Sequence, residues 1–417
     1  MTATSVTTPA PATRAVVTGI GVTAPNGLGT EAYWKAALAG VNGIRELSRF
    51  DAGRFPSRLA GEITDFRAED HLPGRLLPQT DLSTRLTLAA SDWALADAEV
   101  TPETLTDYTK GVVTSNATGG FEFTHGEFRK LWTEGPEHVS VYESFAWFYA
   151  VNTGQISIRN SMRGPSAALV GEQAGGLDAI GHARRTVRQG TDLMVTGGVD
   201  SALDPWGYAS QLAGGRVTTV ADPDRAYLPF DTRASGYVPG EGGAILVVEN
   251  PDTARERGVR RVYGEIAGYA ATFDPAPGSG RPSRLGRAAE LALDDAGVAP
   301  GEVDAVFADA AGIPELDRAE AEAIAGIFGP GGVPVTAPKA LTGRLYAGGG
   351  PLDVVAALLA IRDGVLPATA GTGEVPETYG LDLVLGEPRE LPVGTALVLA
   401  RGRWGFNAAV VVRAAHL

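Results

Sequence analysis

The amino-acid sequence predicts an α/β protein in two similar halves, because strand and helix patterns alternate along the chain and the alternation starts twice. Short runs of β-branched and other apolar residues stand between amphipathic segments, as expected of buried strands covered by helices. The chain has 417 residues, which exceeds one ordinary domain core. We therefore expect one large duplicated fold, with halves at residues 14–260 and 261–417.

The first half begins with a predicted strand at residues 15–21, closed by the Ala-Pro-Asn-Gly turn at 24–27. A helix is expected next at 30–39, with Thr30 as its N-cap. Residues 1–13 are rich in Thr, Ala and Pro without periodicity and are predicted to form a disordered tail. The other predicted elements of this half are strands at 111–115, 167–170, 193–196 and 244–249, and helices at 83–98 and 175–188.

The second half repeats this order. A strand is predicted at 262–267, followed by a helix at 284–296 and a strand at 305–308. A helix at 352–363 and two closing strands at 395–401 and 408–413 complete the pattern.

Composition and charge exclude several kinds of partner and chemistry. The net charge is −14, so the field of the protein repels nucleic acid. No apolar run reaches the roughly 18 residues of a membrane span, and no leader pattern opens the chain, so we expect a cytoplasmic protein without a membrane partner. The chain contains no cysteine, which excludes disulfides, thiolate metal sites and a cysteine nucleophile. It has five histidines, none of them between residues 183 and 415.

The segment from Ser166 to His182 has the pattern of a strand-to-helix elbow. A short apolar strand ends at Val170, the chain turns at Gly171, and a helix begins after Gly175 and Gly176. Nucleophiles are often held at such elbows, where helix N–H groups favour developing negative charge. The elbow residue here is Gln173, and an amide is not a nucleophile.

This segment resembles the active-site elbow of β-ketoacyl synthases, with Gln173 in place of the family's cysteine. The resemblance extends from Val16 to Val412, and residues 229–242 resemble the family's PFDxxRxG…GEG loop. Glutamine in a GEQAGG setting is typical of the chain length factors, the ketosynthase β subunits of type II aromatic polyketide synthases, and the chain is most similar to actinorhodin-type subunits. The resemblance implies a thiolase-like fold, a five-layered αβαβα sandwich of two duplicated halves.

Other positions of the family's catalytic site also differ here. Asp309 stands at the place of the first histidine, and Arg344 at that of the second, whereas Lys339 is retained. Asp317 and Glu320 keep the acidic residues of the family's HGTxTxxND…E stretch, and the family's GFGG loop reads Gly-Phe-Asn-Ala at 405–408. The resemblance therefore implies loss of the Cys-His-His condensation site. Asp309 and Arg344 are predicted to form a buried ion pair.

An aromatic stripe follows the strand at 111–115. Phe121, Thr124 and Phe128 are spaced i, i+3 and i+7, so they share a helix face, a pattern that is usually core packing. In chain length factors the matching positions line the tunnel for the growing polyketide at the subunit interface. We therefore expect these three residues, together with Trp206, to limit chain length sterically, with core packing as the alternative for Trp206.

Two further segments bear on partners. The aromatic-rich run at 141–149 suits a large obligate interface, which is also how the family uses this neighbourhood. Arg184, Arg185 and Arg188 close the helix after the elbow and are expected to face solvent, complementing the helix dipole.

The function implied by the resemblance is that of a non-condensing, chain-length-determining subunit. It would form an obligate heterodimer with a catalytic ketosynthase α subunit and build a poly-β-ketone, an octaketide, from malonyl-acyl carrier protein. No metal or nucleotide cofactor is expected, since the phosphopantetheine arm belongs to the carrier. Two alternatives stay open: a malonyl-carrier decarboxylase that supplies the acetyl primer through Gln173, and a purely structural partner of the ketosynthase.

Overall fold

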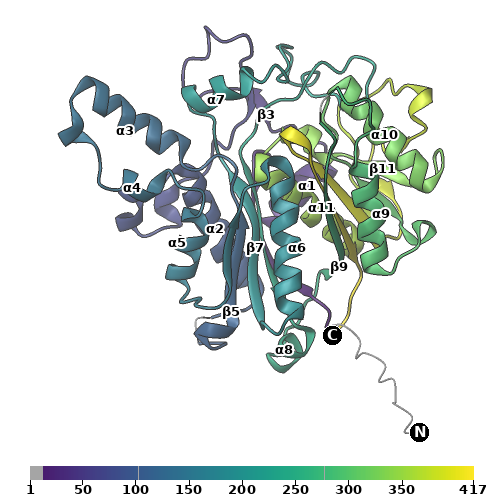
Figure 1. Cartoon of the computed structure of the whole chain (residues 1–417), viewed down its shortest axis with the longest axis horizontal. Coiled ribbons are helices and arrows are strands. Elements are labelled where there is room, and N and C mark those ends of the chain that lie inside the picture. The colour runs from purple at the N-terminus through teal and green to yellow at the C-terminus, as the bar shows by residue number, and fades with distance from the viewer. Residues whose placement is uncertain (1–12, 102, 277) are drawn as a thin grey trace.

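The computed structural model describes residues 13–101, 103–276 and 278–417 (Figure 1). The tail predicted at 1–13 lies outside these ranges except for Thr13. A twelve-stranded sheet runs through the described residues, and each half of the chain contributes one side of it.

The first side of the sheet has the spatial order β1-β8-β7-β5-β6. The pairs β1–β8 and β8–β7 are antiparallel, whereas the pairs β7–β5 and β5–β6 are parallel. All of these strands except β6 are buried, which explains their continuous apolar character. Their bounds are β1 Val16–Ala24, β5 Lys110–Ser115, β6 Ser166–Leu169, β7 Leu193–Asp200 and β8 Gly242–Glu249.

The second side repeats that order with strands from the second half, β9-β16-β15-β10-β11, and β13 extends it. When the five matching strands of each half are numbered in chain order, both sides have the spatial order 1-5-4-2-3. The parallel and antiparallel pairs are also the same on both sides. The predicted duplication of the fold is confirmed by this topology. The bounds are β9 Gly264–Phe273, β10 Ala305–Phe307, β11 Pro334–Thr336, β13 Asp382–Leu383, β15 Thr395–Arg401 and β16 Phe406–Arg413.

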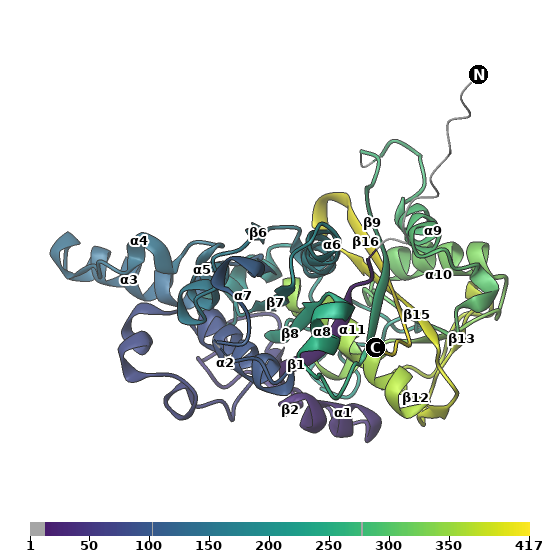
Figure 2. The same cartoon turned by 90° about the horizontal axis from the view of Figure 1, so that it is seen from below.

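The two sides meet along a short seam, where Val16 and Val17 of β1 pair with the start of β9. Helices α6 (Gly175–Arg188) and α11 (Gly349–Asp363) pack against both sides and form a middle layer (Figure 2). Helix α2 (Leu82–Asp97) covers the outer face of the first side, and α9 (Leu285–Ala296) that of the second. The predicted five-layered αβαβα sandwich is confirmed.

The middle layer is close-packed because its helices carry small residues where they meet their neighbours. A Cβ at Gly181 of α6 would lie 2.3 Å from the ring of Tyr269, and one at Gly176 would lie 2.1 Å from the carbonyl oxygen of Ala347. Both positions exclude a side chain, so α6 can lie directly between the two sides of the sheet.

The remaining elements surround this sandwich, and α3 and α4 project from its edge near α5 in both views (Figures 1 and 2). Within the described residues, no helix is both long and apolar enough to cross a membrane. The bounds of these elements are β2 Gly27–Leu28, α1 Thr30–Leu38, β3 Ile44–Glu46, β4 Leu59–Gly61, α3 Phe121–Thr133, α4 Glu143–Ala146, α5 Val151–Arg159, α7 Pro205–Leu212, α8 Pro251–Glu256, α10 Pro314–Phe328, β12 Val365–Leu366 and β14 Arg389–Glu390.

Two local expectations are wrong. Thr30 does not cap α1: Gly29 occupies the N-cap position, and the Thr30 hydroxyl donates to the carbonyl of Ile20 instead. Arg184 does not face solvent. Its guanidinium is buried, where it donates to the carbonyl oxygens of Ile266 and Ala267 at 2.9 and 2.6 Å and pairs with Asp295 at 2.6 Å. Arg184 thus fastens the middle helix to the second side of the sheet.

Candidate functional site

The predicted elbow is present between β6 and α6. A single 3₁₀ turn, Glu172–Ala174, joins them, and Glu172 has a left-handed backbone with φ of 52°. This conformation is strained for a residue with a side chain. The Glu172 carboxylate accepts from the backbone N–H of Gln173 and of Arg403, both at 2.8 Å. The carboxylate therefore ties the elbow to the loop before β16.

The Gln173 side chain lies buried at the start of the middle layer. It is 7% exposed, and its Oε1 lies 3.5 Å from where a Cβ on Gly349, the first residue of α11, would stand. Gln173 lines a cavity of about 90 Å³. The other residues of the lining are Glu172, Arg216, Tyr237, Asp274, Asp309, Ala311, Ile313, Leu316, Arg344, Arg401, Gly402, Arg403, Trp404 and Gly405.

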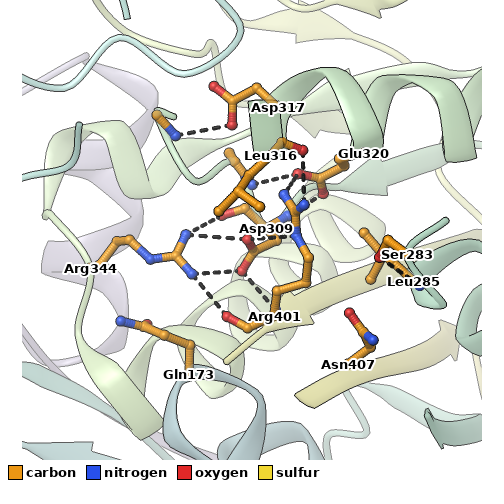
Figure 3. A network of polar contacts seen from close by, with 12 residues as sticks. Gln173, Ser283, Leu285, Asp309, Leu316, Asp317, Glu320, Arg344, Arg401 and Asn407 are labelled. Carbon is orange, nitrogen blue, oxygen red and sulfur yellow. Dashed lines mark hydrogen bonds and ion pairs between the residues drawn. The ribbon is translucent and has the colours of Figure 1, made fainter. Parts of the chain in front are cut away.

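Asp309 and Arg344 form the predicted buried ion pair beside Gln173 (Figure 3). Nη2 of Arg344 lies 2.8 Å from Oδ1 of Asp309, and Nη1 donates to the Asp309 carbonyl oxygen at 2.8 Å. Nη2 also donates to the carbonyl of Arg401 at 3.1 Å. The guanidinium thus has several acceptors, which is what permits a charge to be buried.

Arg401, at the end of β15, is a second cation in this cluster. Its backbone N–H and its Nε donate to Asp309 at 2.8 and 3.2 Å, and its Nη2 lies 2.9 Å from Oε2 of Glu320. The sequence analysis did not single out this residue. The available signal was a lone arginine that ends an otherwise apolar strand, since such a charge needs a buried acid as its partner.

Glu320 and Asp317, both on α10, hold the loop that carries Asp309. Glu320 accepts from the backbone N–H of Asp309 and Ala310 at 2.7 and 2.9 Å. Asp317 accepts from the backbone N–H of Gly312 at 3.0 Å and of Phe230 at 2.8 Å. The two retained carboxylates therefore shape the backbone of the loop after β10.

The electrostatics of the cluster follow from burial and charge. Burial alone would raise the pKa of Asp309, but the charges of Arg344 and Arg401 outweigh it and hold that pKa well below its usual range. Asp317 has no cation bonded to it, so burial, with Glu320 nearby, raises its pKa to about 7. The cluster thus keeps Asp309 charged and Arg344 in place.

Lys339 is paired elsewhere. Its Nζ lies 2.6 Å from Oδ2 of Asp353 on α11, and both side chains are buried. Burial raises the pKa of Asp353 to about 6, although the ammonium of Lys339 opposes this shift. The structure therefore brings Gln173, Asp309 and Arg344 together around one cavity, while Lys339 joins the 3₁₀ turn after β11 to the middle layer.

A second cluster of predicted residues lies between α3 and α7. The ring centroids of Phe121 and Phe128 lie 4.9 and 5.9 Å from that of Trp206, and Phe128 also contacts Trp132 at 5.4 Å. We call the cavity beside these rings the aromatic pocket: it has a volume of about 460 Å³ and is lined by His125, Phe128, Trp132, Pro205 and Trp206.

The predicted stripe is only partly assembled at this pocket. Thr124 is buried beside Glu143 of α4 and does not belong to the pocket lining. His125 and Trp132, which the sequence analysis missed, take part instead. Both lie on the face of α3 that carries Phe121, four and eleven residues further on, so helical spacing was the signal that could have found them.

The run at 141–149 exposes apolar side chains on the same projecting part of the chain. Val141, Trp147 and Phe148 are exposed, as are Ile158 on α5 and Val170 after β6. Within the described residues, β6 is the edge strand of its side of the sheet and pairs with β5 alone. An edge strand followed by an exposed apolar residue is typical of a face that another chain covers.

Comparisons with known proteins agree with these features. The β-ketoacyl synthase N-terminal domain matches residues 12–254, and the C-terminal domain matches residues 263–372. The chain is 69% identical over 398 residues to the actinorhodin polyketide putative beta-ketoacyl synthase 2 of Streptomyces coelicolor, covering 95% of this chain and 98% of that protein. It is 60% identical over 399 residues to the tetracenomycin polyketide synthase ketoacyl synthase beta subunit of Streptomyces glaucescens, with coverage of 95% and 98%.

Two solved structures extend the comparison. The ishigamide ketosynthase/chain length factor superposes with a TM-score of 0.89 at 27% identity, covering 97% of this chain and 100% of that one. A type II polyketide synthase acyl-carrier protein in complex with its ketosynthase bound to the hexaketide matches with a TM-score of 0.87 at 25% identity and the same coverage. On these matches, together with the elbow and the duplicated fold, the chain belongs to the β-ketoacyl synthase family, among the ketosynthase β subunits, or chain length factors, of type II polyketide synthases.

Proposed function

We propose that this chain is the non-condensing, chain-length-determining subunit of a type II polyketide synthase. It pairs with a catalytic ketosynthase α subunit in a heterodimer and shapes the space in which a poly-β-ketone grows from malonyl-acyl carrier protein. The reactive thiol and the histidines of condensation belong to the partner, and the phosphopantetheine arm belongs to the carrier.

The observation that carries the first part of this proposal is the Asp309–Arg344 pair beside Gln173. Condensation needs a thiolate that accepts the acyl group and donors that stabilise the enolate formed on decarboxylation. The chain has no cysteine, and the cavity at the elbow is lined by an ion pair. An acyl chain therefore has no thiol to attach to at this site.

Intact-mass spectrometry tests this part directly. The purified chain, its catalytic partner and the complex of both would each be incubated with malonyl-acyl carrier protein and an acyl donor. We expect a thioester adduct on the partner and none on this chain, with polyketide released by the complex alone. An acyl adduct on this chain would overturn the proposal.

The length-setting role is supported by the aromatic pocket. Phe121 and Phe128 pack against Trp206, and large rings at the end of a tunnel stop chain growth by steric exclusion. Two phenylalanines packed against Trp206 fit a chain of medium length, and we propose an octaketide. The test is product length after Phe121→Ala or Phe128→Ala in the reconstituted complex, where unchanged length would favour a purely structural role for the subunit.

The pairing with a ketosynthase is supported by the exposed apolar face around β6. Val170, which directly follows β6, is exposed, and so are Trp147 and Phe148 in the segment before α5. One of the similar solved structures is the ishigamide ketosynthase/chain length factor. Co-expression with the catalytic partner should give a stable complex of one copy of each chain.

One alternative, malonyl-carrier decarboxylation, has an observation of its own. The Gln173 side chain lies at the N-terminal ends of both middle helices, beside Gly175 and Gly349, where an amide could donate to a malonyl thioester carbonyl. This activity would be established if the complex with a partner that lacks its cysteine still released carbon dioxide from malonyl-acyl carrier protein. Gln173→Ala in this chain should then abolish the release.

A further inference from the structure

A hydrogen bond between an imidazole and a carboxylate borders the aromatic pocket. Nδ1 of His125 on α3 lies 2.6 Å from Oδ2 of Asp204, which is the N-cap of α7. The Asp204 carboxylate is buried and also accepts from the backbone N–H of Trp206 and Gly207, both at 3.0 Å. It is therefore fixed by the helix that it caps, and it fixes the ring of His125 in turn.

The partners of Asp204 determine which ring nitrogen of His125 remains available for another hydrogen bond. A carboxylate that accepts two backbone N–H groups acts as an acceptor toward His125 too, so Nδ1 carries a hydrogen. Nε2 is then the ring nitrogen that is available to a ligand. It accepts a hydrogen bond when the ring is neutral and donates one when the ring is protonated.

The remaining walls of the aromatic pocket are apolar rings. Phe128, Trp132, Pro205 and Trp206 complete the lining, and the His125 side chain keeps about one third of its surface exposed. A planar, partly polar ligand fits such walls, because the rings stack on its faces and one polar group meets an oxygen at its edge. An enolised β-diketone has this shape, and a poly-β-ketone presents an oxygen on every second carbon.

We propose that His125, oriented by Asp204, is a positioning residue for the poly-β-ketone: its Nε2 hydrogen-bonds a keto or enol oxygen of the chain in the aromatic pocket. This inference rests on the proposed function. The aromatic rings limit how much room the polyketide has, and the hydrogen bond to His125 would fix which carbonyl of the polyketide lies in the aromatic pocket.

Side-chain length separates this role from simple packing. Glutamine at position 125 carries its amide near the place of Nε2, whereas asparagine reaches only to the place of Nδ1. Phenylalanine keeps the ring and removes both nitrogens. Asp204→Asn keeps an oxygen to cap α7 and removes the carboxylate that orients His125.

The experiment uses the complex with the catalytic ketosynthase, malonyl-acyl carrier protein as substrate, and the distribution of released products as the readout. Loss of one hydrogen bond corresponds to about threefold to tenfold in selectivity, so His125→Phe and Asp204→Asn should lower the ratio of principal product to other lengths and shunt products by that factor. His125→Gln should restore the ratio and His125→Asn should not. Thermal unfolding of each complex reports on folding, and if His125→Phe fails to assemble, the comparison of Gln with Asn decides.

Two outcomes overturn the inference. Equal product ratios for the Gln and Asn variants would assign position 125 to packing alone. An unchanged distribution in His125→Phe and Asp204→Asn, with a changed one in Phe128→Ala, would refute the inference and leave the proposed function in place. If Phe128→Ala also changed nothing, the length-setting function itself would fail.

Discussion

Arg401 donates to Asp309 twice, through its backbone N–H at 2.8 Å and its Nε at 3.2 Å. This contact joins the end of β15 to the loop after β10, and Arg344 completes it from the other side of the carboxylate. Two guanidinium groups thus share one buried carboxylate, and the cluster holds three separate segments of the second half together.

Removing the central carboxylate should destabilise the protein strongly. Asp309→Ala leaves the Arg344 and Arg401 guanidinium groups buried with fewer acceptors, and we expect the free energy of unfolding to fall by about 3–5 kcal/mol. Urea unfolding measures this loss. As a control, Arg287→Ala removes the exposed ion pair with Glu290 and should cost about 1 kcal/mol or less. Equal losses in the two variants would contradict the role of the cluster.

How much of this site was predictable depends on the range of the interactions. Gln173 at the elbow and the duplicated fold follow from local pattern, because a strand, a turn and a helix are encoded by neighbouring residues. The Asp309–Arg344 pair was predicted only through the resemblance, since 35 residues separate the partners in the chain.

Two of the contacts that sequence reasoning missed are long-range. Arg401 reaches Asp309 across 92 residues, and Arg184 reaches Asp295 across 111. A basic residue near a helix end is normally solvated, and only the packing of α6 between the two sides of the sheet buries Arg184. The N-cap prediction for Thr30 was wrong because its hydroxyl donates to the carbonyl of Ile20 on β1, a tertiary contact that helix-capping rules do not include.

Stability should depend on pH through Asp317. Its pKa in the folded protein is raised to about 7, mainly by burial, above the value of about 4 for an unfolded chain. The folded state therefore binds this proton more tightly than the unfolded state does. The resulting contribution to the free energy of unfolding is fully present below pH 4 and is lost as the pH rises to about 7, by up to about 1.4 kcal/mol per pH unit. Comparing the wild type with Asp317→Asn isolates this group from the other buried acids. Parallel stability curves for the two proteins between pH 4 and 7 would refute the shift.

Introducing a thiol at the elbow should not give condensation. In Gln173→Cys the new side chain faces the cavity lined by the Asp309–Arg344 pair, and the residues that line this cavity include no imidazole to act as a base or as an enolate donor. We expect no polyketide above background from the isolated variant given malonyl-acyl carrier protein, measured by mass spectrometry of products. Condensation by the isolated variant would show that the ion pair does not block the chemistry.

Opening the aromatic pocket should lengthen the product. Phe128→Ala and Trp206→Ala each remove a ring from the contact between α3 and α7, and the extra space should admit at least one more two-carbon unit. Product masses from the reconstituted complex measure the change. Tyr108→Ala, which removes an exposed ring outside this pocket, is the matched control and should leave the length unchanged.

Charge placed on the exposed face beside β6 should weaken the complex with the ketosynthase. Val170 follows this edge strand and is 52% exposed, and Val41, at 48%, is an exposed valine in the turn after α1. If the ketosynthase covers the β6 face, Val170→Asp buries an unpaired carboxylate in the interface and should raise the dissociation constant at least about tenfold. Val41→Asp adds the same charge and should leave it unchanged. Analytical ultracentrifugation of the two variants with the partner decides: comparable dissociation constants would mean that the partner binds elsewhere, because the added charge is the same and only its position differs.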